Sequence, residues 1–183
     1  MAGGNRGRTF WITRTAVFAA LLIVLQAASA LLANPYLTGC VVNMALIVSV
    51  VIGGYATGLT VAVISPVAAK LVGIGPFWSL IPAIAAGNAA LVTVWHFVCG
   101  GYVSKRLSRG VIALIAAAIA KFAVLYIGVA RIIVPYFLKL PETQANVISS
   151  MFSVQQLITA SVGGVLAIMV LPALRKAVDV WHL

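Results

Sequence analysis

Long apolar runs alternate with short polar or glycine- and proline-rich breaks along the whole chain. The runs cover residues 10–32, 38–55, 57–72, 77–99, 110–134 and 147–172. Most are close to the roughly 20 residues that a helix needs to cross the hydrocarbon core of a bilayer. The pattern predicts an all-α polytopic membrane protein: a compact bundle of six transmembrane helices, forming a single integral membrane domain over residues 1–183.

Proline marks several ends of these runs. Pro35 follows the first run and disfavours helix at Asn34, the residue before it. Pro82 is expected to kink or break the first turns of the fourth helix. Pro135 and Pro172 are predicted to close the fifth and sixth helices.

The composition supports a membrane location, since 63% of the residues are hydrophobic and only 2 of the 183 are Asp or Glu. The first apolar run is too long for a removable signal peptide and is expected to stay as a helix. Cys40 and Cys99 are predicted at opposite ends of the bilayer, so a disulfide between them is not expected.

The basic residues predict the orientation of the bundle. Three clusters precede the first run, separate the fourth from the fifth and follow the sixth, and an even number of spans places all three on one side: Arg6, Arg8, Arg14, Lys105, Arg106, Arg109, Arg175 and Lys176. Because cytoplasmic loops carry an excess of Lys and Arg, both termini are expected in the cytoplasm. Short clusters between apolar runs do not resemble a nucleic-acid-binding face, so no nucleic acid partner is expected.

Several functional classes are disfavoured. Neither Glu142 nor Asp179 lies in a long apolar run, whereas ion-driven transporters usually keep a carboxylate at membrane depth. Lys121, near the middle of the fifth run, could in principle carry a proton instead. The sequence lacks the glycine-rich phosphate loop of an ATPase and a repeated channel filter. His96 has no second histidine or carboxylate placed to complete a metal site, so no catalytic residues, metal or cofactor are expected.

Four stretches are more specific than composition. The first run contains Thr15-Ala16-Val17-Phe18-Ala19-Ala20, in which Ala16 and Ala20 lie one helical turn apart and form a smooth groove. The second begins Thr38-Gly39-Cys40-Val41-Val42-Asn43. Ser65-Pro66 lies in the third, and Ile81-Pro82 followed by Gly87-Asn88 lies in the fourth.

The order and depth of these motifs resemble the substrate-binding S component of energy-coupling factor (ECF) vitamin transporters. The resemblance covers nearly the whole chain. It implies a receptor in a prokaryotic cell membrane that binds a vitamin on the extracellular side and associates with a membrane coupling protein (T component) and two cytoplasmic ATPase subunits. It also implies that Ala16 and Ala20 dock against the coupling protein. From the sequence alone, packing within the bundle is an equal alternative for these two alanines.

Depth in the membrane selects the candidate ligand-binding residues. Polar and aromatic side chains are predicted in the extracellular part of the bundle, with one amide near the midplane: Asn34, Tyr36, Thr38, Asn43, Lys70, Trp78, Asn88, Arg131, Tyr136, Lys139, Asn146, Gln155 and Gln156. A single buried amide is more often an interhelical hydrogen bond than a ligand contact. Tyr36 and Trp78 also fit an interfacial aromatic belt.

Three of these candidates bear on the charge of the ligand. Lys70, Arg131 and Lys139 are predicted on the outer side with only Glu142 to offset them, which favours an anionic ligand such as a carboxylate or phosphate. The two lysines could instead snorkel to lipid headgroups. The sequence thus favours a subunit that binds pantothenate or another small anionic vitamin for ATP-driven uptake. The alternatives are a self-sufficient secondary transporter or channel, and a membrane scaffold without a ligand.

Overall fold

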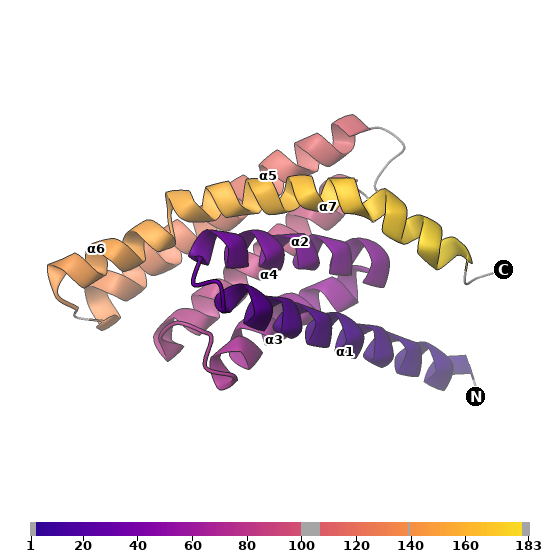
Figure 1. Cartoon of the computed structure of the whole chain (residues 1–183), viewed down its shortest axis with the longest axis horizontal. Coiled ribbons are helices and arrows are strands. Elements are labelled where there is room, and N and C mark those ends of the chain that lie inside the picture. Colours follow the sequence, from indigo (N-terminus) through magenta and orange to yellow (C-terminus); the bar gives the residue numbers. More distant parts are fainter. Residues whose placement is uncertain (1–2, 100–106, 139, 181–183) are drawn as a thin grey trace.

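The computed structural model describes residues 3–99, 107–138 and 140–180, which form helices joined by short connections, without a β-strand among them (Figure 1). The elements are α1 (Gly3–Ala30), α2 (Pro35–Gly53), α3 (Tyr55–Leu71), the 3-10 turn η1 (Trp78–Leu80), α4 (Ile81–Cys99), α5 (Leu107–Leu125), the π-helix η2 (Tyr126–Leu138), α6 (Glu142–Met151) and α7 (Val154–Val180). Five helical segments are long and apolar enough to cross a membrane, and α3 is a shorter apolar helix. The predicted all-α, multi-pass membrane architecture is confirmed.

Five helices form a closed ring, in which α2, α3, α4, α5 and α7 each pack against the next and α7 returns to α2. Helix α1 packs against α2 and α3 from outside the ring. Helix α2 is the most buried membrane-length segment, since it contacts four other helices. The main hydrophobic core lies inside the ring and includes Leu46, Leu91 and Trp95.

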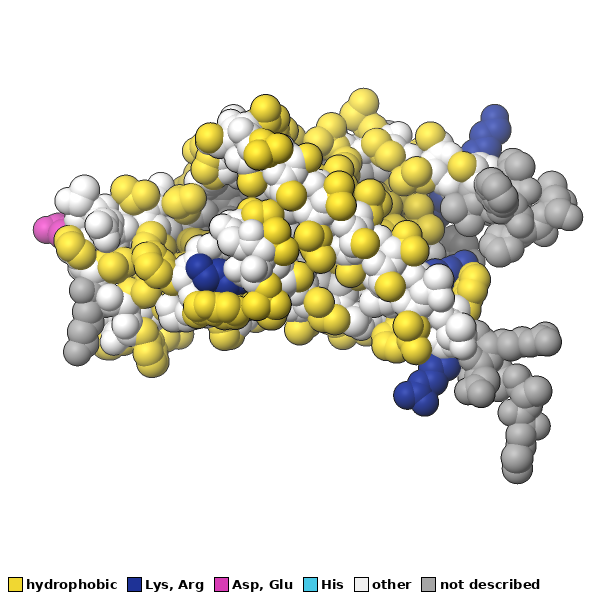
Figure 2. All heavy atoms as spheres, turned by 60° about the horizontal axis from the view of Figure 1, so that its bottom comes forward, with side chains coloured by type: hydrophobic (Ala, Val, Ile, Leu, Met, Phe, Trp, Pro, Cys, Tyr) yellow, Lys and Arg dark blue, Asp and Glu magenta, His cyan; other side chains and the backbone are white. Residues whose placement is uncertain are grey.

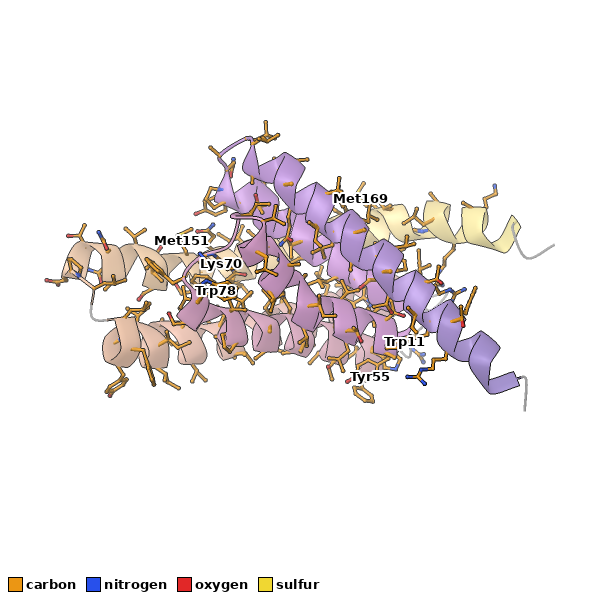
Figure 3. The ribbon with its side chains drawn as sticks, turned by 90° about the horizontal axis from the view of Figure 1, so that it is seen from below. Trp11, Tyr55, Lys70, Trp78, Met151 and Met169 are labelled. Carbon is orange, nitrogen blue, oxygen red and sulfur yellow. The ribbon has the colours of Figure 1, made fainter. Side chains whose placement is uncertain are left out.

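Both termini of the described chain lie at one end of the bundle (Figure 1), called here the terminal end. The opposite end holds the α1–α2 and α3–η1 connections together with α6, and is called here the loop end. Figure 2 shows most of the visible Lys and Arg side chains at the terminal end, a carboxylate at the tip of the loop end, and mainly apolar side chains between them, with a further Lys or Arg side chain in the loop half. In Figure 3, Trp11 and Tyr55 lie toward the terminal end, whereas Lys70, Trp78 and Met151 lie toward the loop end.

The predicted sixth helix is two helices, so its expected range of 147–172 is wrong. Helix α6 ends at Met151, and α7 begins at Val154. Ser153 N donates to Ser150 O at 3.2 Å, and Ser153 Oγ donates to the same carbonyl at 3.1 Å. These short-range bonds replace the regular helical pattern and separate the two helices.

Proline ends fewer helices than the sequence predicted. Pro135 lies inside η2 and Pro172 inside α7, which continues to Val180. Membrane helices tolerate proline because neighbouring groups and local adjustments satisfy the freed backbone. Pro82 has the predicted effect, since the 3-10 turn η1 precedes it and α4 begins only at Ile81.

Asn34 begins a helix as well as following one. Its Oδ1 accepts hydrogen bonds from Tyr36 N at 3.0 Å and Leu37 N at 3.3 Å, and Pro35 occupies the first position of α2. An asparagine cap followed by proline is a favoured helix start. Helix α2 therefore begins three residues earlier than the predicted 38.

Candidate functional site

A cavity of about 570 Å³ opens into the loop half of the bundle. Its wall is formed by the end of α1, the α1–α2 connection, the start of α2, the α3–η1 connection and the junction between α6 and α7. The volume lies within the range of small-molecule sites, ~300–1,000 Å³. Most of the lining is apolar, with Phe77, Leu80, Met151 and Phe152 among its larger side chains.

Lys121 forms part of the inner wall of this cavity. It lies on α5 and is only 3% exposed, although lysine is costly to place at membrane depth. Its Nζ donates to Asn43 Oδ1 at 2.6 Å and to Asn88 Oδ1 at 2.7 Å. Both amides are also buried. Distances this short are typical of hydrogen bonds from a charged donor.

The Asn43 amide is held by helix α7. Its Nδ2 donates to Thr159 Oγ1 at 3.4 Å, and Thr159 Oγ1 in turn donates to Gln156 O at 3.3 Å. With its nitrogen engaged by α7, the amide presents its oxygen to Lys121.

The Asn88 amide is held by helix α3. Pro66 has no N–H and cannot donate the usual helical bond to Ala62 O, four residues earlier. Asn88 Nδ2 donates to that carbonyl at 3.5 Å, and its oxygen faces Lys121. The proline in Ser65-Pro66 thus supplies an acceptor that fixes the orientation of Asn88.

Two glycines allow these groups to meet. A Cβ atom at Gly39 would lie 2.9 Å from Thr159 Cβ, and one at Gly87 would lie 2.7 Å from Leu125 Cγ. Both distances are too short for a side chain without a shift of the neighbour. Gly39 therefore allows α7 to approach α2 beside Asn43, and Gly87 allows α5 to approach α4 beside Asn88.

Every helix of the ring contributes one group to this cluster. Asn43 comes from α2, Asn88 from α4, Lys121 from α5 and Thr159 from α7, while α3 provides the carbonyl of Ala62. Interhelical hydrogen bonds in membrane proteins contribute only about 0.6 kcal/mol each on average. A buried lysine is thus poorly explained by stability alone, which favours a binding role for it.

The structure brings five of the predicted site residues to the cavity wall: Asn34, Thr38, Asn88, Gln155 and Gln156. A sixth, Asn43, lies one hydrogen bond behind the wall through Lys121. The motif Thr38-Gly39-x-x-x-Asn43 therefore combines a lining residue, a close helix approach and a partner of Lys121.

The other predicted site residues do not line the cavity. Tyr36, Trp78, Tyr136 and Asn146 are exposed, and Lys139 lies outside the described residues. Arg131 is also exposed, and its Nε donates to Tyr126 Oη at 3.0 Å. Lys70 Nζ donates to Gly75 O at 3.3 Å, so Lys70 supports a lining residue without lining the cavity itself.

Two polar lining residues, Lys121 and Gln26, were not among the predicted site residues. Lys121 had a visible signal, since it is an ionisable residue within an apolar run. Gln26 is 9% exposed and its Oε1 is buried without a hydrogen-bond partner among the described residues. As an amide inside the first apolar run, Gln26 offered a similar but weaker signal.

Ala16 and Ala20 are exposed on the surface of α1. Their side chains therefore do not pack into the bundle formed by the described residues, which leaves this part of α1 open to a neighbouring helix or to lipid.

The cavity combines a few polar groups with a largely apolar wall. Lys121 provides a cationic donor, the amides provide polar contacts, and the rest of the wall is apolar. Among the described residues, no group of three or more His, Cys, Asp or Glu side chains is placed to hold a metal ion. No protein-family model matches the chain, and no curated protein or solved structure matches it either.

Proposed function

We propose that this chain is the substrate-binding subunit of an ECF-type importer and captures a small anionic vitamin. The observation that carries the proposal is the cavity at the loop end with Lys121 in its inner wall. Buried polar groups within an otherwise apolar pocket are typical of small-molecule sites. Among the described residues that line the cavity, Lys121 is the only Lys, Arg, Asp or Glu, and in its protonated form it gives the wall a positive charge that an anion complements.

The distribution of charge gives the proposed orientation. Basic residues lie in the first part of α1, in the first turn of α5 and near the end of α7, all toward the terminal end (Figure 1): Arg8, Arg14, Arg109, Arg175 and Lys176. By the positive-inside rule, this end is proposed to face the cytoplasm. The cavity at the loop end then faces the extracellular side, where an uptake receptor meets its ligand.

The energy for uptake is proposed to come from partners. The sequence has no phosphate-binding loop for ATP, and Glu142 does not line the cavity. A membrane coupling protein and two cytoplasmic ATPase subunits would supply the driving force. The exposed Ala16 and Ala20 of α1 offer a smooth surface on which a helix of the coupling protein can pack closely.

A self-sufficient secondary transporter is the second candidate, and the burial of Lys121 is the observation that favours it. An amine at membrane depth can in principle gain and lose a proton during a transport cycle. In that case the chain would accumulate its substrate without ATP.

Reconstitution separates the two candidates. The purified chain is placed in liposomes alone or together with a coupling protein and ATPase pair, and uptake of radiolabelled pantothenate, biotin and nicotinate is measured. We expect tight binding by the chain alone and uptake only when partners and ATP are present. Accumulation by the chain alone in response to an ion gradient would support the secondary transporter instead.

A further inference from the structure

The hydrogen bonds of Lys121 leave part of its binding capacity unused. A lysine ammonium has three N–H donors. Asn43 Oδ1 and Asn88 Oδ1 accept two of them, and the third has no acceptor among the described residues. Because Lys121 lines the cavity, a ligand there can accept the third hydrogen bond.

Gln26 provides a second unused polar group in the same cavity. Its side chain lies on α1 and is more than nine-tenths buried, and its Oε1 has no hydrogen-bond partner among the described residues. A buried acceptor without a partner costs about 1–3 kcal/mol, so such groups normally have a reason to persist. The side-chain amide has to turn for Oε1 to face the cavity, where a ligand with an N–H or O–H group would satisfy it.

The surroundings restrict what else the ligand can be. Most of the other residues that line the cavity are apolar, among them Val42, Leu80, Ile84 and Phe152. Since none of the described lining residues is Asp or Glu, a cationic group on the ligand would meet Lys121 without a compensating charge.

We propose, on the basis of the proposed function, that the ligand is a small organic acid with two polar ends. Its carboxylate accepts a hydrogen bond from Lys121 Nζ, and an N–H or O–H group at the other end donates to Gln26 Oε1. Asn43 and Asn88 are positioning residues, because they act through Lys121. The carboxylate therefore binds at the inner wall rather than near Lys70 or Arg131.

Matched pairs of acids and their neutral counterparts test this assignment. The probes are pantothenate with pantothenol, biotin with biotinamide, and nicotinate with nicotinamide, and their affinities for the purified full chain are measured in detergent. Because a charge-assisted hydrogen bond to a buried lysine is replaced by a weaker one, we expect the acid of the recognised pair to bind about tenfold or more tightly than its neutral partner.

Two variants test the proposed contacts of the ligand with Lys121 and Gln26. Lys121→Met should abolish the preference for the acid, leaving the two members of the pair within about threefold of each other. Gln26→Leu should weaken both members about equally, by roughly three- to tenfold, because it removes a contact that they share. Arg131→Met is the matched control and should leave the preference unchanged, since Arg131 is exposed and does not line the cavity.

The outcomes distinguish this inference from the proposed function. If the neutral member of a pair binds the wild-type chain as tightly as the acid, the assignment of the carboxylate to Lys121 is overturned while the binding function stands. If the acid preference survives in Lys121→Met, another group binds the carboxylate, and the assignment is again overturned. If no pair binds, the proposed function fails for these vitamins and the inference fails with it.

Discussion

Asn88 donates a hydrogen bond to the carbonyl that Pro66 leaves without its usual helical partner. The acceptor is Ala62 O, at 3.5 Å from Asn88 Nδ2, and the other end of the same amide accepts from Lys121 at 2.7 Å. A proline on α3 therefore influences the position of a lysine on α5, through one side chain of α4.

Replacing Pro66 tests this relay. Pro66→Ala restores an N–H that can bond to Ala62 O, so Asn88 should lose its fixed orientation. We expect affinity for the recognised acid to fall about three- to tenfold while the melting temperature stays the same or rises, because a regular helical bond is gained. Binding and thermal unfolding of the purified protein measure both effects. Unchanged affinity would show that Pro66 does not act through Asn88.

A carboxylate beside Lys121 should separate stability from binding. Asn43→Asp keeps the shape of the side chain. In the wild type the Thr159 hydroxyl accepts a hydrogen bond from the Asn43 nitrogen, and in the variant it can donate one to the oxygen that replaces this nitrogen. The new charge pairs with Lys121 and competes with an anionic ligand. We expect affinity for the acid to fall about tenfold or more, with little loss of thermal stability. A variant that binds the acid normally would contradict an anion site at Lys121.

Arg131 provides a control for the position of the anion site. From the sequence, Arg131 is a candidate contact for an anionic ligand. In the structure the side chain is exposed and bonded to Tyr126, and it does not line the cavity. We now expect Arg131→Gln to change affinity by less than about twofold, whereas Lys121→Met lowers it by about tenfold or more. Equal losses in a side-by-side titration would move the anion site away from Lys121.

Because α4 and α5 approach closely at Gly87, we expect a single added methyl group there to lower the stability of the fold. Gly87→Ala introduces a Cβ that would lie 2.7 Å from Leu125 Cγ, so the melting temperature should drop, by an amount equivalent to ~1–3 kcal/mol. Gly110→Ala is the matched control on α5, where the nearest atom is Ile168 Cδ1 at 3.6 Å. It should be neutral or stabilising by up to ~1 kcal/mol, because alanine favours helix more than glycine does. The reverse order of stabilities would show that α4 and α5 are not packed at Gly87.

We expect bulky substitutions of the exposed alanines of α1 to impair assembly with the coupling protein and not ligand binding. Ala16→Leu combined with Ala20→Leu should leave ligand affinity of the isolated chain unchanged and impair co-purification with the coupling protein and ATP-driven uptake. Leu21→Phe is the control, since Leu21 is also exposed on α1 but lies about 100° or more around the helix axis from both alanines. Loss of ligand binding in the double variant would indicate that these alanines support the fold instead.

The fold was largely predictable from the sequence because apolar run length is a strong signal in membrane proteins. The errors occurred where local chemistry changes a helix without interrupting the apolar run. The break between Met151 and Val154 depends on serine hydrogen bonds, and the continuation past Pro172 depends on neighbouring groups. Neither feature is visible in hydropathy.

The site was only partly predictable. The predicted depth in the membrane correctly selected Asn34, Thr38, Asn43 and Asn88, which lie on or beside the cavity, because polar residues in an apolar run face the protein interior. It could not separate inward from outward positions near the loop end, where water and headgroups accept Arg131 and Trp78 on the surface. The link between Pro66 and Asn88 depends on which helices are neighbours, which the sequence does not state.

The most direct test is native mass spectrometry of the wild-type chain and of Lys121→Met, each purified without partner subunits, followed by identification of the released small molecules. We predict that the wild-type chain carries a small organic acid in a one-to-one complex and that Lys121→Met carries less than about a tenth as much. Wild-type protein that releases no small molecule and binds none of the tested vitamins would contradict the central claim that this chain is a receptor.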